Sequence, residues 1–262
     1  MAISGISSAG NYAQQTAVSK YYHQASSGNR INSAADDAAG LAISEKLETA
    51  RTIYDVGADN AAAGKDLINV ADGALSTITD SLQRIRELSL QAANSAIYTP
   101  TDVSAMQDEI SQLKDQIAST ANTAQFNTKH LLDGTEGEFN IATNQDGSGT
   151  TLHMPTTLLS SLGIEDYDVT GSFNIGDIDK AIAKVSEGRS GLGAASNVLD
   201  HTIGFNKLAS YNHSAAKSRI KDTEYGQTIS DLKKTQVLEQ FRLRMQKNKE
   251  DENGRVLQLF KY

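Results

Sequence analysis

A repeat of apolar and small residues runs along one stretch of the chain in alternating steps of three and four. Its positions are Leu47, Ala50, Tyr54, Gly57, Ala61, Gly64, Ile68, Ala71, Leu75, Ile78, Leu82, Ile85, Ser89 and Ala92. None of these positions is charged. A spacing of 3.5 residues kept over about six heptads is typical of a long helix packed against other long helices. At 1.5 Å per residue, this helix would be a rod roughly 70 Å long.

The size of the residues changes along this repeat. Gly57, Ala61 and Gly64 are small, so we expect a partner helix to approach closely there. The large residues from Ile68 to Ile85 are expected to supply the core. The sequence therefore predicts a helical bundle with a close contact toward one end and a thicker core toward the other.

A break and a second helix follow the long repeat. Pro100 cannot continue a helix interior, and Thr101 or Asp102 can cap a new helix. That helix has an apolar face at Met106, Ile110, Leu113, Ile117 and Ala121. Residues 138–143 and 150–154 then alternate with period two around the turn residues Asn144 to Gly147, which predicts a β-hairpin at about 138–154.

Helical periodicity returns after the hairpin. The first helical stretch has apolar residues at Ile178, Ile182, Val185, Leu192, Leu199 and Ile203. A final stretch has Ile229, Leu232, Leu238, Phe241 and Met245, which we expect on one side of a second helix. The fold class is therefore mainly α: a long antiparallel helical bundle or coiled-coil rod with a small β-hairpin patch. The N- and C-terminal halves should pack together, because neither apolar stripe is covered otherwise.

Composition narrows the possible functions. The net charge of −8 argues against a nucleic-acid partner, since neutralising phosphates requires a clustered basic surface. The chain has no cysteine, so it has neither a disulfide framework nor a thiolate metal site. No basic segment followed by an apolar stretch opens the sequence, and no run of about 18 apolar residues occurs, so we expect neither a cleaved signal peptide nor membrane insertion.

Several motifs, in order along the chain, resemble bacterial flagellin, the subunit of the flagellar filament. The most extensive are SSGNRINSAADDAAGLAIS at 26–44 and LQRIRELSLQAAN at 82–94. Shorter ones are QFNTKHLLDG at 125–134, RSGLGA at 189–194, LDHTI at 199–203 and VLQLF at 256–260. The resemblance implies a structural subunit that polymerises into a hollow helical filament serving motility, without enzymatic activity and without a cofactor.

The same resemblance implies a layered arrangement and a set of partners. Residues 1–40 and 223–262 would form an inner coiled-coil domain, and residues 45–220 an outer helical rod, with no additional outer domains. The expected partners are further copies of the chain, an export chaperone, and cap and hook-junction proteins of the flagellum. The expected location is the extracellular filament, reached through the flagellar export apparatus.

Three groups of residues take roles from this resemblance. Arg30, Asp36, Asp37 and Gly40 would form the connector between the two layers. Val256, Leu257, Leu259 and Phe260 would serve polymerisation at the C-terminal end. The third group, Gln83, Arg84, Leu88 and Glu109, matches the family's contacts with a host Toll-like receptor of the leucine-rich-repeat type.

Spacing supports a shared surface for two residues of the third group. Arg84 and Leu88 are four residues apart, so they lie on one helix face. They also lie off the Leu82–Ile85 seam, and we therefore expect both to be accessible. The competing interpretation is a contact between subunits, and if both hold, the site is hidden in the polymer and open in the monomer.

Other interpretations of the same features remain open. The pair Asp36–Asp37 could hold a metal or act as acid and base, but neighbouring helical residues point about 100° apart, and no histidine lies near in sequence. The glycines at 191 and 193 imitate a dinucleotide fingerprint, yet no strand precedes them, so close helix packing is the favoured interpretation. At the level of function, the alternatives are a filament-associated adhesin or junction protein and, more remotely, an enzyme.

The chain also departs from the family pattern at both ends. Asn29 stands where the family usually has leucine. Arg242, Arg244, Lys247 and residues 249–252 bring charges into a region that the family usually fills with Ala, Gln and Ser. These charges are expected to face either a channel or a neighbouring subunit.

Overall fold

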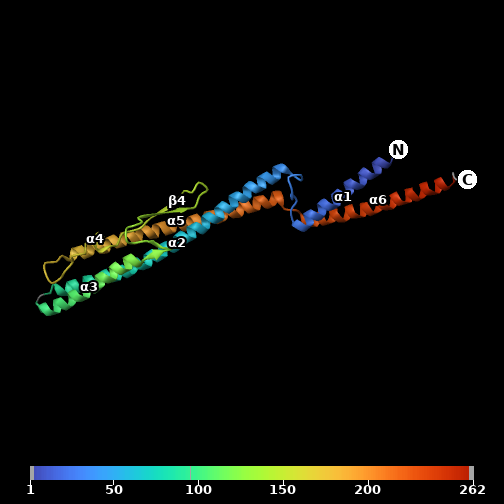
Figure 1. Cartoon of the computed structure of the whole chain (residues 1–262). Coiled ribbons are helices and arrows are strands. Elements are labelled where there is room, and N and C mark those ends of the chain that lie inside the picture. The colour runs from blue at the N-terminus through green and yellow to red at the C-terminus, as the bar shows by residue number, and fades with distance from the viewer. Residues whose placement is uncertain (1–2, 95, 260–262) are drawn as a thin grey trace. The chain divides into compact units, whose positions relative to one another are not determined.

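The computed structural model describes residues 3–94 and 96–259, with side chains from 15 to 256 apart from residue 95. Six helices of the described chain are α1 (Ile3–Ser27), α2 (Ala38–Ala92), α3 (Pro100–Thr123), α4 (Leu159–Leu162), α5 (Ile175–Lys221) and α6 (Tyr225–Leu259) (Figure 1). The chain divides into two compact units. Thr52–Ser210 forms the first, and Met1–Arg51 joins Tyr211–Tyr262 in the second.

The unit Thr52–Ser210 is a helical bundle in which α2, α3 and α5 run side by side (Figure 1). The α2 seam supplies much of its core, with Leu75, Ile78, Leu82 and Ile85 fully buried. Ile110 and Ile117 of α3 and Ile178 and Val185 of α5 are buried in the same cluster. The predicted packing of N-terminal against C-terminal helices is therefore confirmed.

Three ion pairs align α2 with α5 inside this unit. Lys65 pairs with Asp200, Asp72 with Arg189 and Arg86 with Asp179. Residue numbers rise along α2 as they fall along α5, so the two helices are antiparallel. Exposed ion pairs of this kind each contribute about 1 kcal/mol or less to the free energy of unfolding. We therefore infer that they fix the register of α2 against α5 more than they stabilise the fold.

Helix α3 begins differently from the sequence prediction. Its N-cap is Thr99, whose hydroxyl oxygen accepts a hydrogen bond from the backbone N–H of Asp102, so the expectation of a cap at Thr101 or Asp102 is wrong. Pro100 occupies the first helical turn, where a missing N–H costs nothing. Asp102 accepts a hydrogen bond from the backbone N–H of Thr99 in return and completes a capping box.

The predicted β-hairpin is present. Strand β3 (Glu138–Ala142) pairs antiparallel with β4 (Gly149–His153), and Phe139 faces Leu152 across the pair. Phe139 and Leu152 are both buried. The alternation of the sequence therefore located both strands.

The hairpin occupies part of the space that the glycines of α2 were expected to leave for a helix. A Cβ atom at Gly57 would collide with the carbonyl oxygen of Thr143 from the hairpin loop and would lie 2.7 Å from Nδ2 of Asn206 on α5. A Cβ atom at Gly64 would meet Ile141 of β3 at 3.0 Å and Leu199 of α5 at 3.2 Å. The expected close approach exists, but strand and helix share it.

A second strand pair was missed. Strand β1 (Gln125–Phe126) pairs with β2 (Lys129–His130) through the two-residue turn Asn127–Thr128. Both turn residues have positive φ, 46° and 68°. Hairpin turns of two residues need this backbone, which Asn tolerates and Thr resists, so only Asn127 offered a signal in the sequence.

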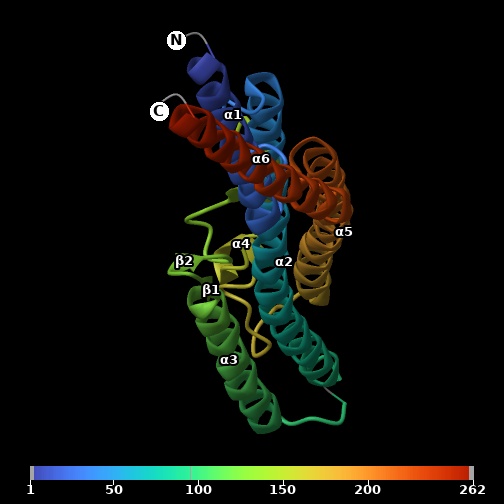
Figure 2. The same cartoon turned by 90° about the vertical axis from the view of Figure 1, so that its right-hand side faces the viewer.

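In the unit of the two chain ends, α1 packs against α6 (Figure 2). Among the described side chains of α6, which end at Val256, Thr228, Leu232 and Thr235 are buried. The expectation that Phe241 shares their side is wrong, because Phe241 is 62% exposed while Leu232 is 8% exposed. Phe241 follows Leu232 by nine positions, or two and a half helical turns, which places the two side chains on opposite faces of α6.

Candidate functional site

The connector between α1 and α2 is tied to the segment between α5 and α6. The backbone N–H of Arg30 donates to the carbonyl oxygen of Lys221 at 2.7 Å, and that of Thr223 to the carbonyl oxygen of Gly28 at 3.0 Å. Asn29 and Asp222 form an isolated antiparallel bridge. The sequence had located only the N-terminal half of this connector.

Arg30 reinforces the connector with its side chain. Its Nη2 atom donates to the carbonyl oxygen of Ile220 at 2.7 Å and lies 3.9 Å from Oδ2 of Asp37. The carbonyl oxygen of Arg30 accepts a hydrogen bond from Nε2 of Gln24 at 2.7 Å. One residue thus contacts α1, the start of α2 and the end of α5.

The two adjacent aspartates have separate structural tasks. Asp37 caps α2, since its Oδ1 atom accepts a hydrogen bond from the backbone N–H of Gly40 at 2.8 Å. Asp36 folds the loop before it, accepting from the backbone N–H groups of Asn32 and Ser33 through Oδ2. These hydrogen bonds, chiefly that from Asn32, lower the pKa of Asp36.

Gly40 is buried, and there is no room for a larger side chain at this position. A Cβ atom there would lie 2.5 Å from Oδ2 of Asp37 and 2.7 Å from Cδ1 of Ile31, a fully buried side chain. The loop that contains Ile31 and Asp37 can therefore pack against the first turn of α2 only because residue 40 has no side chain.

A three-residue ion cluster lies where α2 meets the end of α5. Glu48 accepts hydrogen bonds from Arg51 at 2.7 Å and from Nζ of Lys217 at 2.9 Å. These two partners lower the pKa of Glu48 to about 2. The cluster joins the N-terminal and C-terminal segments of the same unit.

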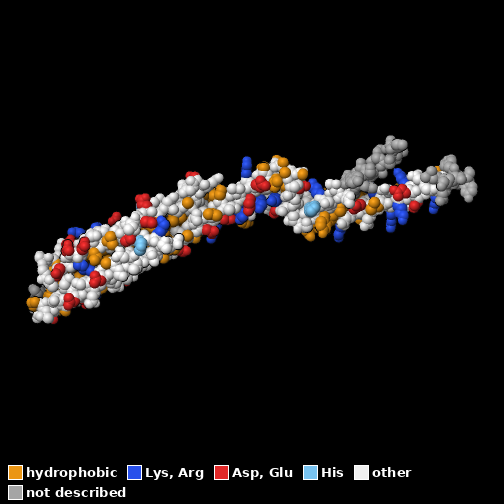
Figure 3. Space-filling model, viewed as in Figure 1, with side chains coloured by type: hydrophobic (Ala, Val, Ile, Leu, Met, Phe, Trp, Pro, Cys, Tyr) orange, Lys and Arg blue, Asp and Glu red, His pale blue; other side chains and the backbone are white. Residues whose placement is uncertain are grey.

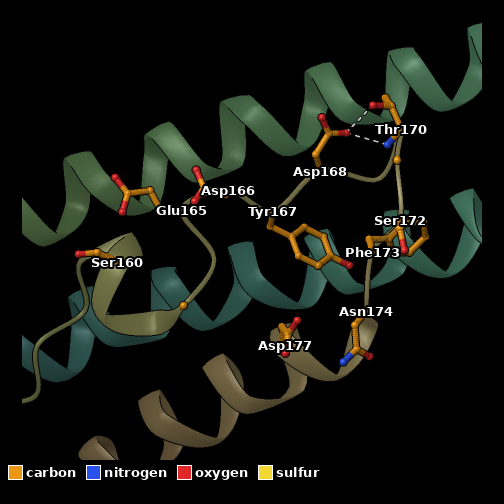
Figure 4. Close-up of a pocket in the computed structure, with 12 residues that line it drawn as sticks. Ser160, Glu165, Asp166, Tyr167, Asp168, Thr170, Ser172, Phe173, Asn174 and Asp177 are labelled. Atoms are coloured by element: carbon orange, nitrogen blue, oxygen red, sulfur yellow. Dashed lines mark hydrogen bonds between the residues drawn. The ribbon is translucent and has the colours of Figure 1, made fainter.

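Among the described residues, no group of three or more His, Asp or Glu side chains is placed to hold a metal ion. A hollow beside the loop before α5 does collect Glu165, Asp166, Asp168 and Asp177 (Figure 4). Asp168 is turned to Thr170, however, accepting from its backbone N–H at 2.7 Å and from its hydroxyl at 2.6 Å. These hydrogen bonds fold the loop back on itself.

The residues matched to receptor recognition divide into exposed and buried ones. Arg84 pairs with Glu109 of α3 at 2.7 Å and with Glu87 at 3.1 Å, and these carboxylates, Glu109 first, raise its pKa. Gln83 is exposed beside them. Glu87 was not among the predicted residues, although its position three after Arg84 is a regular helical pairing.

Leu88 corrects the sequence prediction. It is only 2% exposed and belongs to the core cluster, so it is not accessible. The buried face of α2 is wider than the single row of residues predicted from the repeat. Both α3 and α5 pack on this helix, so a second row that includes Ser81 and Leu88 is buried as well. The accessible surface consists of Gln83, Arg84, Glu87 and Glu109.

Helix α6 carries exposed apolar side chains on the face turned away from α1. Val237, Leu238, Phe241 and Met245 are between 47% and 64% exposed. Figure 3 shows apolar side chains alternating with Lys and Arg on this segment. Of the predicted C-terminal group, Val256 is 49% exposed, whereas the side chains of Leu257 and Leu259 and all of Phe260 lie outside the described residues.

The glycines of the 189–194 motif do not serve close packing within the chain. A Cβ atom at Gly191 or Gly193 would have no atom within 4 Å. The favoured interpretation of close helix packing is therefore wrong for the single chain. Gly188 of α5 is closely packed instead, since a Cβ atom there would lie 2.7 Å from the ring of Pro155.

The chain is a protein built mainly of long packed helices, and comparison with known proteins identifies its family. Residues 4–137 match the model of the bacterial flagellin N-terminal helical region, and residues 175–260 that of the C-terminal helical region. The chain therefore belongs to the flagellin family. None of its described helices has the length and apolarity needed to span a membrane.

Individual relatives agree. Flagellin of Halalkalibacterium halodurans is 37% identical over 92% of this chain and 91% of its own length. Flagellin FlaB2 of Treponema pallidum is 37% identical over 85% of both chains. The crystal structure of Bacillus cereus flagellin matches with a TM-score of 0.50 and 29% identity over 56% of this chain and 88% of its own. As a flagellin, the chain is a structural subunit of the filament of the bacterial flagellum.

Proposed function

We propose that this flagellin polymerises by covering the exposed apolar face of α6 with neighbouring subunits. The observation that carries the proposal is the exposure of Val237, Phe241 and Met245 in a helix whose other face is already packed against α1. Exposed apolar side chains that recur every four residues form a stripe along one helix face, which is typical of a surface that a second helix covers. The filament thus supplies contacts that the single chain lacks.

We propose that the two parts of the chain divide the work of the filament. Residues 1–40 and 223–262 form the inner domain, and residues 45–220 form the outer rod, without further outer domains. The hydrogen bonds between residues 28–30 and 220–223 support this division, since they join the segment between α1 and α2 to the segment between α5 and α6.

We further propose that the exposed group Gln83, Arg84 and Glu109 is recognised by the host Toll-like receptor for flagellin. The charged pair of Arg84 and Glu109 bridges α2 and α3 and presents a polar surface. Leu88 contributes from beneath by packing the helix that carries Gln83 and Arg84. In the polymer a neighbouring subunit would cover this surface.

The remaining partners follow from the same function. The chain would meet an export chaperone, then cap and hook-junction proteins, and would leave the cell through the flagellar export apparatus without losing a signal peptide. We assign it no catalytic activity, in keeping with the structural role of the family.

The experiment that tests polymerisation uses purified full chain and fragments of its own filaments as seeds. The wild type should elongate the seeds, and the chain lacking residues 256–262 should not, while its circular dichroism keeps the helical signal. Normal filaments from the shortened chain would contradict the assignment of the C-terminal residues. A wild type that binds filaments without extending them would indicate a filament-associated protein instead.

A further inference from the structure

Helix α5 carries two rows of residues with coiled-coil spacing, and only one of them is buried; in the other, Phe205 touches Tyr54 of α2 edge to face but is still 64% exposed. The inner row, which includes Val185, Leu192 and Leu199, is buried. The second, here called the outer row, steps by three and four along the exposed residues Gly191, Ala194, Val198, His201, Phe205 and Leu208. A helix with two such rows packs against partners on both sides.

The outer row has the size pattern of a helix contact. Gly191 and Ala194 are small, and a Cβ atom at Gly191 would meet nothing within 4 Å. Val198, Phe205 and Leu208 follow with exposures of 50%, 64% and 60%. A partner helix could approach closely at the small residues and pack against the large ones.

The row is also free of charge in an acidic unit. Thr52–Ser210 contains 9 Lys or Arg and 21 Asp or Glu, a net charge of −12. From residue 190 to residue 208, however, the only charged residues are Asp200, which pairs with Lys65 of α2, and Lys207, and neither belongs to the outer row. Two copies of such a unit repel each other wherever their carboxylates approach. The outer row is a face at which they can meet without that cost.

We infer that the outer row of α5 is a lateral contact with a second copy of this chain in the filament. This inference rests on the proposed polymerisation. Because a filament requires a contact that does not close, the outer row meets a different helix face of the neighbour and not the neighbour's own outer row. It adds a contact in the outer rod to the one proposed on α6.

Two pairs of variants test the inference, each with a control on the same helix. Gly191→Gln places a large side chain in the outer row, and Gly193→Gln places the same one two residues away, off the row. Val198→Asp and Gly193→Asp compare an added negative charge in the same manner. All these positions are exposed in the single chain, so each variant should fold. The two glutamine variants should melt higher than the wild type because glycine disfavours helix.

The measurement is the critical concentration for elongation of wild-type seeds by full-length monomer. Gly191→Gln and Val198→Asp should raise it about tenfold or more, and both Gly193 variants should stay within about twofold of the wild type. Equal behaviour of the row variants and their controls would overturn the inference and leave polymerisation itself intact. If the wild type does not elongate the seeds, the proposed function fails, and the inference fails with it.

Discussion

Nη2 of Arg30 lies 2.7 Å from the carbonyl oxygen of Ile220, although 190 positions separate the two residues along the chain. The same guanidinium lies beside Asp37, the cap of α2. A single side chain thereby joins the segment between α1 and α2 to the end of α5. This contact accounts for the otherwise unexplained arginine in the loop between α1 and α2.

Replacing Arg30 should loosen the connector without unfolding the helices. In Arg30→Ala, residues 28–37 should become accessible to protease at a rate several times that of the wild type, since opening then breaks fewer contacts. Arg219→Ala, an exposed arginine on the same unit, serves as the control. Identical cleavage patterns for the two variants would contradict the role of Arg30.

Gly57 and Gly73 of α2 should respond to alanine in opposite directions. Gly57→Ala introduces a collision with the backbone of Thr143 and should destabilise the chain by about 1–3 kcal/mol. Gly73→Ala meets no atom within 4 Å and should stabilise it by up to about 1 kcal/mol through helix propensity. Urea unfolding followed by circular dichroism measures both. A stabilised Gly57→Ala would show that the hairpin does not pack on α2 as described.

The ion cluster at Glu48 predicts a specific acid sensitivity. Its pKa is lowered from 4.5 to about 2 by Arg51 and Lys217, so its stabilising effect is complete above pH 4.5 and is lost as the pH falls toward 2. With the side chain 37% exposed, the effect should be about 1 kcal/mol or less. Glu48→Gln should therefore lose less stability than the wild type between about pH 6 and pH 3.

The control for this prediction is Glu45→Gln, which changes an exposed carboxylate one turn earlier on α2. Thermal unfolding curves across the pH range should coincide for this variant and the wild type. If Glu48→Gln shows the full acid sensitivity of the wild type, the cluster is not its source.

Arg84 and Leu88 should separate recognition from folding. Arg84→Ala should reduce monomer binding to the receptor by on the order of 2 kcal/mol and leave unfolding nearly unchanged, because the side chain is 44% exposed. Leu88→Ala removes a buried side chain and should cost about 2–5 kcal/mol of stability. Surface plasmon resonance and urea unfolding of both variants test this division. An Arg84→Ala monomer that binds as tightly as the wild type would remove Arg84 from the recognised surface.

The sequence predicted the features that depend on periodicity. The α2 seam, the apolar positions of α3 and α5 and the β3–β4 hairpin all repeat regularly, so local pattern and tertiary packing agree. The strand pair around Asn127–Thr128 was missed because two-residue strands have no pattern to detect. The burial of Leu88 was missed because one seam was assumed, whereas α2 packs against both α3 and α5.

The connector was only half predictable for a related reason. The motif at 26–44 located Arg30, Asp36, Asp37 and Gly40, yet the partners of Arg30 at Ile220 and Lys221 accept through backbone carbonyl groups. Backbone acceptors leave no trace in residue type. The sequence did not predict the outer row of α5, because Gly191 was interpreted as a site of close helix packing and the row as a whole was not recognised.

We propose above that this flagellin builds a filament with residues 1–40 and 223–262 inside and residues 45–220 outside. An electron-microscopic image reconstruction of filaments grown from the purified chain tests it most directly. We expect a hollow filament in which the α1 and α6 helices surround the channel and the bundle of α2, α3 and α5 forms the outer layer. A filament with these layers reversed, or a chain that forms no filament on seeds of its own kind, would contradict it.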